Sequence, residues 1–279
     1  MFAPKHFFRT ALLSTLVLLA CSKPNTVSPS NFADNGNMLL GNPSQAASSK
    51  PNNYLLDKGY YILSYNNSTR IANWVSWHLD ANAIGTADRQ DDFRPDANLP
   101  SGWYKVDDSS YSGSGFDRGH NCPSADRTSS VAANSATFLM TNMIPQAPNN
   151  NRQTWANLED YARTLVSAGN EVYIIMGTYG SGGTGSNGYA TTIDQGRIAV
   201  PAHIWKVLVV IPQGNNDLAR INTNTRVIAV NTPNSQSISS NWRNYRTSVN
   251  AIEQATGYDI LSNLSESLQT VLEVKVDAN

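Results

Sequence analysis

Runs of apolar and β-branched residues, separated by polar turns, divide this chain into segments typical of strands. Tyr60–Tyr65 and Ala72–Leu79 are rich in aromatic residues and flank the polar segment NNSTRI, a pattern that predicts a β-hairpin. Three further runs are strongly apolar and predict strands: Glu171–Gly177, Ile204–Ile211 and Thr225–Asn231. Strands this apolar predict a sheet at the centre of the fold.

Helical periodicity occurs in two places among these strands. Trp155–Val166 carries apolar residues at helical spacing and ends before Gly169, and Trp242–Gln254 ends in the same way before Gly257. Thr137–Met143, which precedes the first helix, is short, apolar and partly β-branched, so it predicts a buried strand. Strands with helices inserted between them favour the α+β class, with a mostly antiparallel central sheet flanked by helices.

The start of the chain has the pattern of an export signal. Residues 1–20 place basic side chains before Ala11–Ala20, an apolar run of about ten residues that is too short to span a bilayer. The run ends in Leu18-Leu19-Ala20-Cys21, which resembles the cleavage box of bacterial lipoproteins. We expect cleavage before Cys21 and lipid attachment to its sulfur, with an ordinary secretory signal as the alternative. The protein would then be exported, and either held at a membrane on the periplasmic or cell-surface side or secreted.

Composition separates this signal from the remainder of the chain. Residues 21–53 are rich in Ser, Asn, Pro and Ala and have almost no apolar periodicity, which predicts a flexible tether. Residues 54–279 hold all the predicted elements without an internal repeat, so they predict one domain. Lipidation of Cys21 would leave Cys122 without a disulfide partner, and stability would then depend on burial.

The charge balance excludes a globally basic protein. With 20 Lys and Arg against 21 Asp and Glu, the net charge is −1, so any attraction to phosphate must be local. This balance weakens a pure nucleic-acid-binding role more than it weakens an enzymatic one.

Side chains able to carry chemistry concentrate between Phe116 and Glu159. The segment reads FDRGHNCPSADR and then TFLMTNMIPQAPNNNRQTWANLE, which predicts strand, loop, strand and helix. Gly119 permits close backbone approach beside His120, whereas His78 and His203 have surroundings that predict structural roles. From these residues alone, His120 could be a catalytic base or a structural histidine.

Asn151 and Glu159 lie at the two ends of the first turns of the predicted helix. Their separation corresponds to roughly 12 Å of rise and about 80° of rotation, too far for both to touch one ion. A metal bound directly by Asn151 and reached by Glu159 through a water fits this spacing, and Mg²⁺ accepts such oxygen ligands. The alternative is that Asn151 only caps the helix and Glu159 only supports its surface.

Two competing motifs lack the context that they need. Gly180–Gly185 matches a dinucleotide-binding pattern and follows a strand, but the polar segment SNGYATTIDQGRIAV after it predicts a loop and no helix. His120-x-Cys122 has no companion ligands at zinc spacing, and no GxSxG nucleophile motif is present.

The segments DRGH, TNMIPQ, NNNRQTW and LEDY closely resemble the DNA/RNA non-specific endonucleases of the ββα-metal finger class, in particular the cyanobacterial sugar-non-specific nucleases. SYNNSTRIANWVSWHL, DRQDDFRPD and GYDILSN agree as well, so the resemblance extends from near Leu39 onward. It implies a ββα-metal nuclease fold. It also implies a Mg²⁺-dependent enzyme, with Mn²⁺ as a substitute, that hydrolyses phosphodiester bonds of DNA and RNA without strong sequence preference and leaves 5′-phosphate ends.

The resemblance also implies roles for single residues. His120 takes the place of the general base that activates the attacking water, and Asn151 that of the magnesium ligand. Glu159 falls on the glutamate that holds metal-bound water. Arg89 falls on the arginine that contacts the phosphate and stabilises its developing charge.

Four further positions complete the implied site. Asn142 and Asp117 belong to its catalytic set, Asn142 as a positioning group and Asp117 as a support for the metal site. Arg163 and Arg118 are expected to bind substrate. The pair Asn121-Cys122 after the motif histidine departs from the small apolar residues expected there, without involving a catalytic position.

Two other functions compete with this interpretation. One is a non-catalytic surface lipoprotein that keeps the fold and binds nucleic acid or another ligand. The other is a metal phosphodiesterase that acts on a small ester.

Overall fold

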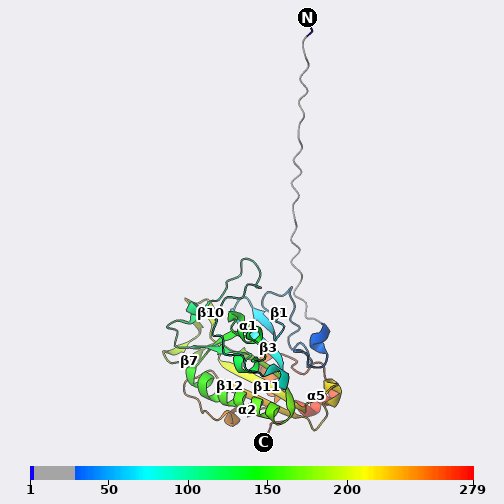
Figure 1. Cartoon of the computed structure of the whole chain (residues 1–279). Coiled ribbons are helices and arrows are strands. Elements are labelled where there is room, and N and C mark those ends of the chain that lie inside the picture. The colour runs from blue at the N-terminus through cyan, green and yellow to red at the C-terminus, as the bar shows by residue number, and fades with distance from the viewer. Residues whose placement is uncertain (3–28) are drawn as a thin grey trace.

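A seven-stranded antiparallel sheet forms the centre of the computed structural model, which describes residues 1–2 and 29–279 (Figure 1). The predicted hairpin, the three later strands and the α+β class with a mostly antiparallel sheet are confirmed. In spatial order the strands are β1 (Tyr54–Asp57), β2 (Ile62–Asn66), β3 (Ile71–Leu79), β6 (Asn170–Tyr179), β11 (His203–Pro212), β12 (Arg226–Pro233) and β13 (Arg246–Thr247).

Short elements surround this sheet. The two-stranded pairs are β4 (Asp117–His120) with β5 (Met143–Gln146), β7 (Gly183–Gly185) with β8 (Gly188–Ala190), and β9 (Thr192–Ile193) with β10 (Ile198–Ala199). The helices are α1 (Val131–Ala136), the π-helical turn η6 (Asn150–Trp155), α2 (Ala156–Ser167), α3 (Asp217–Arg220), α4 (Val249–Thr256) and α5 (Glu266–Leu272). The 3₁₀ turns are η1 (Pro29–Phe32), η2 (Ala81–Ala83), η3 (Asp108–Tyr111), η4 (Ser124–Asp126), η5 (Met140–Asn142) and η7 (Trp242–Tyr245).

The glycine-rich segment after β6 forms the β7–β8 hairpin, and β9 rather than a helix follows it, which confirms the prediction that no helix begins there. Among the described residues, no helix has both the length and the apolar character that crossing a bilayer requires.

Both faces of the sheet are buried, and this explains the continuous apolar runs of its inner strands. Along β6, Ile174 and Met176 lie in one core with the α2 residues, while Ile175 lies in a second core on the opposite face. The second core includes residues of α4, α5 and the segment before β1. The protein therefore has three layers, with the sheet in the middle (Figure 1).

The folded part begins earlier than the predicted boundary at Tyr54. Met38, Leu39 and Leu40 are at most 2% exposed and belong to the second core. Asn263 donates backbone and side-chain hydrogen bonds to the carbonyls of Leu40 and Leu39, at 3.0 and 2.9 Å. The prediction of a tether through residue 53 is thus wrong for this stretch, because its apolar cluster is buried by elements from the other end of the chain. The predicted signal and Cys21 fall largely on residues 3–28, outside the described residues.

Two predicted elements differ from the structure in type. Thr137–Met143 is not a strand, because Thr137 ends α1 and its hydroxyl donates to the Asn134 carbonyl at 2.7 Å. The strand starts only at Met143. Trp242–Gln254 is not one helix, because residues 246–247 pair with β12 and Ser248 caps a new helix, α4, whose end at Gly257 agrees with the prediction.

Candidate functional site

The strand, loop, strand and helix order predicted for the motif is confirmed as β4, β5, η6 and α2. Gly119 faces Ile144 across the β4–β5 pair, and a Cβ at Gly119 would lie 2.2 Å from Gln146 Oε1. Only a glycine lets the two strands approach this closely. The side-chain amide of Asn150 donates a hydrogen bond to the backbone carbonyl of Pro233 at 2.9 Å, which fixes the start of the helical segment to β12.

The side chain of Asn142 is fully buried and forms hydrogen bonds with backbone groups. Its Oδ1 accepts from the Cys122 amide at 3.0 Å, and its Nδ2 donates to the carbonyls of Cys122 and Thr137, each at 2.9 Å. All the amide groups of this side chain are therefore occupied. Asn142 holds the loop after His120 in place, as expected of a positioning group, and it has no free atom with which to contact a substrate.

His120 ends β4 among aromatic rings. Its ring centroid lies 4.9 Å from that of Phe138 and 5.7 Å from that of Phe93, both in edge-on arrangements. Its Nε2 is buried and makes no hydrogen bond to the described residues. Burial lowers the pKa of His120 to about 3, with Arg89 and Arg118 as further causes, so the imidazole is neutral and able to accept a proton at cellular pH.

The two arginines lie over the same aromatic rings. The guanidinium carbon of Arg118 is 3.9 Å from the Phe93 ring centroid, and that of Arg89 is 4.8 Å from the Phe138 centroid. Arg89 also donates to Ser124 Oγ at 2.8 Å. Its Nε donates to Asp91 Oδ1 at 2.7 Å, so stacking leaves only its remaining in-plane N–H groups, together with those of Arg118, available to an anion.

Asp117 fixes the orientation of the Asn151 amide. The Nδ2 of Asn151 donates to Asp117 Oδ2 at 2.9 Å, while Arg152 donates to both carboxylate oxygens, at 2.8 and 2.6 Å. Because an ionised carboxylate can only accept, the amide nitrogen must face Asp117. Asn151 Oδ1 is thereby left available as a hard oxygen ligand.

These groups share one pocket of about 380 Å³. It is lined by four of the predicted site residues, Arg89, Asp117, Arg118 and Asn151, and by Phe93 and Tyr111 among others. His120 adjoins it through its contact with Phe93. The pocket thus combines two arginines with a free amide oxygen and the carboxylates of Asp91, Asp108 and Asp117, and the neutral imidazole of His120 lies next to it, behind Phe93.

Glu159 and Arg163 do not line this pocket. Glu159 accepts from Lys206 Nζ at 3.1 Å through Oε1, and burial raises the pKa of Glu159 even though Lys206 acts in the opposite direction. Lys206 is 1% exposed, and its ammonium lies 5.4 and 5.0 Å from the ring centroids of Trp77 and Trp155. Glu159 Oε2 has no hydrogen bond among the described residues, so it is the oxygen that a water could use.

Arg163 is committed to ion pairs with carboxylates. It donates to Asp126 Oδ1 at 2.7 Å and to Asp160 Oδ1 at 2.6 Å, and Asp126 is itself 1% exposed. In this arrangement Arg163 links α2 to Asp126 of the η4 turn and is not presented to the pocket.

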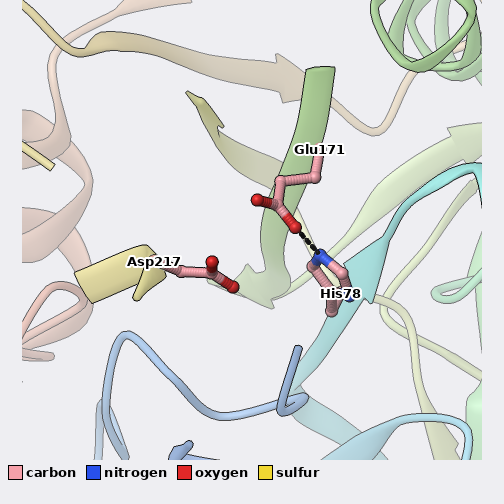
Figure 2. A group of neighbouring side chains, drawn as sticks. All are labelled: His78, Glu171 and Asp217. Carbon is pink, nitrogen blue, oxygen red and sulfur yellow. Dashed lines mark hydrogen bonds and ion pairs between the residues drawn. The ribbon is translucent and has the colours of Figure 1, made fainter. Parts of the chain in front are cut away.

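A second group of ionisable side chains, His78, Glu171 and Asp217, lies close enough to hold an ion (Figure 2). Its oxygens are already engaged: Glu171 accepts from His78 Nε2 at 2.9 Å, and both carboxylates accept from Arg220. Asp217 also accepts from the Tyr173 hydroxyl. Because Arg220 supplies the positive charge that an ion would bring, this cluster is a structural network, in agreement with the role predicted for His78.

Sequence reasoning missed the aromatic rings and the buried lysine of the site. Phe93 lies within the segment DRQDDFRPD, and Arg152 directly follows Asn151. Both are therefore close in sequence to residues that the motifs did identify. Lys206 is one polar residue in the apolar run IWKVLVVI, and an inward-facing charge there indicates a buried partner.

Comparison with known proteins agrees with this geometry. The family model described as DNA/RNA non-specific endonuclease matches residues 42–267. The chain is 53% identical to a "Nuclease" of Nostoc sp., over 86% of this chain and 85% of that protein. It is 34% identical to "Nuclease C1" of Cunninghamella echinulata, over 76% and 84%. A solved structure of the EndoG/EndoGI complex aligns with a TM-score of 0.71 at 24% identity, covering 91% of this chain and all of that one, which confirms the fold.

Proposed function

Because the chain belongs to the DNA/RNA non-specific endonuclease family, we propose that it is a Mg²⁺-dependent endonuclease that cuts DNA and RNA without strong sequence preference. The observation that carries this proposal is the hydrogen bond from Asn151 Nδ2 to Asp117, which leaves an amide oxygen free in a pocket that also holds two arginines. A hard cation and a phosphate are the complementary ligands of such a site.

The residues present fit a magnesium ion. Asn151 Oδ1 would bind it directly, and Glu159 would reach it through a water by way of Oε2. Mg²⁺ keeps several waters and needs few protein ligands, which agrees with a single direct ligand. When bound, the ion would neutralise the negative charge that develops on the phosphate and on the leaving 3′-oxygen.

His120 would take the proton from the attacking water. Its neutral state supports this role, and a general base typically contributes ~10²–10⁴-fold to the rate. The lowered pKa makes His120 a weak base, chiefly because it is buried and in addition because Arg89 and Arg118 bring uncompensated positive charge. A bound phosphate provides that compensation, so substrate binding would raise the basicity of His120 when it is needed.

Arg89 and Arg118 would bind the phosphate groups of the substrate. Contacts to phosphate carry no base information, which agrees with cleavage that ignores sequence. In-line attack by water and departure of the 3′-oxygen would give the 5′-phosphate ends expected of this family. Arg163 would contribute indirectly, through Asp126 and the placement of Glu159.

A cleavage assay on two substrates tests the proposal. Protein lacking residues 1–28 should cut both supercoiled plasmid and single-stranded RNA with Mg²⁺ and neither with EDTA, and His120→Ala should abolish both reactions. A folded protein that cuts neither substrate with Mg²⁺ or Mn²⁺ would favour a binding lipoprotein. Cleavage confined to a chromogenic diester would favour a phosphodiesterase for small esters.

The sequence also supports a location outside the cytoplasm. The basic start, the short apolar run and Cys21 favour export with a lipid anchor at that cysteine. Residues 21–28 would then connect the membrane to the domain.

A further inference from the structure

We propose that Glu253, Asp259 and Glu273 form a structural calcium site at the junction of α4, α5 and the segment before β1. One carboxylate oxygen from each residue lies within 4.8 Å of the others. Two oxygens that bind the same Ca²⁺ at about 2.4 Å can lie at most about 4.8 Å apart, so the three carboxylates meet the distance limit for a shared ion.

Glu273 supplies an independent sign that a ligand belongs there. It is 6% exposed, and its Oε1 is buried without a hydrogen-bond partner among the described residues. A buried charged oxygen with no partner is costly, and native structures normally provide one. Burial and the two neighbouring carboxylates raise the pKa of Glu273 to about 7, so a proton would compete with the metal ion for this carboxylate.

No cation of the described chain compensates the cluster. None of its three carboxylates forms an ion pair with a described residue, and Lys275, two positions after Glu273, donates instead to the Thr223 carbonyl. Glu253 accepts one backbone hydrogen bond, from Ile260 at 2.7 Å. This distinguishes the cluster from His78, Glu171 and Asp217, where Arg220 already provides the positive charge.

The position of the cluster indicates what the ion would do. The Glu273 carbonyl accepts from the Asn250 amide in the first turn of α4, and the Asp259 amide donates to the Pro43 carbonyl. Asp259 is exposed and Glu273 is buried, so an ion could enter from solvent and keep waters on its outer side. An ion bound here would join the end of α4, the segment after it and the end of α5, and the hydrogen bond from Asp259 to Pro43 would connect this junction to the distant segment before β1.

Calcium binding by calorimetry tests the site without reference to nuclease activity. The background is Asn151→Ala, which removes the direct ligand of the proposed catalytic ion. This variant should bind one Ca²⁺ per chain, and Asn151→Ala combined with Glu273→Gln should bind none. Glu266→Gln, which changes an exposed glutamate of the same helix, is the matched control and should leave binding unchanged.

Thermal unfolding distinguishes calcium binding at this site from protonation of Glu273. In EDTA, Glu273→Gln should unfold at a higher temperature than its parent, because it removes a buried charge that has no partner. In calcium, only the parent should gain stability. Absence of calcium binding in the Asn151→Ala background, or equal effects of calcium on parent and Glu273→Gln, would overturn the proposal.

Discussion

The ammonium of Lys206 lies 3.1 Å from Glu159 Oε1, and the lysine is buried between two tryptophans. Lys206 comes from the central strand β11 and Glu159 from the first turn of α2. The pair therefore fixes α2, which directly follows the π-helical turn that holds Asn151, to the middle of the sheet. The pair also occupies Oε1 of Glu159 and leaves Oε2 available to a water.

Lys206→Met should destabilise the protein by about 3 kcal/mol, because breaking a buried ion pair leaves a charge without its partner. Cleavage activity should fall as well. The double variant Glu159→Gln/Lys206→Met should regain most of the stability but little of the activity. Urea unfolding and plasmid cleavage measure the two effects, and a single variant as stable as the parent would show that the pair contributes nothing.

Acid should destabilise the fold in part through His120. Because its folded pKa, about 3, lies below the ordinary 6.5, the unfolded chain binds this proton more tightly. The contribution of His120 to stability is complete above pH 6.5 and is lost as the pH falls from 6.5 toward 3. His120→Gln should therefore lose less stability than the parent when urea unfolding at about pH 5 is compared with about pH 7.

Removal of Arg89 should raise the pKa of His120. The guanidinium is one of the positive charges that disfavour the imidazolium, so Arg89→Gln should move the NMR titration of the His120 ring toward higher pH. Arg243→Gln removes a guanidinium that lies over Tyr161 of α2 and is not a cause of the His120 shift, so as a control it should leave the titration in place. An unchanged His120 titration in Arg89→Gln would show that the charge of Arg89 does not contribute to this pKa.

Asp117→Ala should weaken magnesium binding about 10–100-fold, the usual effect of losing a group that orients a metal ligand. Without Asp117, nothing holds the Asn151 amide nitrogen away from the pocket. Arg152→Gln removes a different partner of Asp117 and should have a much smaller effect. Calorimetric titration with Mg²⁺ compares the two variants. Equal affinities would refute the orienting role of Asp117.

Gly119→Ala should cost about 1–3 kcal/mol, because the added methyl group would overlap the Gln146 side chain in a closely packed strand pair. Combining it with Gln146→Ala should recover part of this loss. Chemical unfolding of the two variants tests the steric explanation, which requires that the second change lessen the effect of the first.

Cys21→Ser should release the protein from membranes if the cysteine carries the proposed anchor. Cell fractionation and immunoblotting of the full-length chain measure this, and unchanged membrane association would contradict lipidation. Cys122→Ser is the control. Cys122 is buried, burial raises its pKa to about 12, and its substitution has no reason to alter the location of the protein.

Local sequence signals were sufficient for the strands and for the motif. The inner strands are continuous apolar runs, and His120, Asn142, Asn151 and Glu159 lie within one ββα unit, so neither needed long-range information. The second strand of that unit was nevertheless misplaced, because Thr137 ends α1 through a local hydrogen bond to Asn134. The other failures depended on partners far away in sequence. Met38–Leu40 looks like part of a polar tether until the C-terminal helices provide a surface, and the role of Lys206 becomes visible only once Trp77 and Trp155 enclose it.

The hydrogen bond from Asn263 to the Leu39 carbonyl joins residues 224 positions apart. Contacts of such sequence separation raise the contact order and slow folding, because a long loop must close before they form. During synthesis, the sheet face that Met38–Leu40 helps to cover cannot be fully buried until the C-terminal helices have been made. An incomplete chain would expose that apolar face, so we expect nascent forms of this protein to depend on chaperones until the last helix has been made.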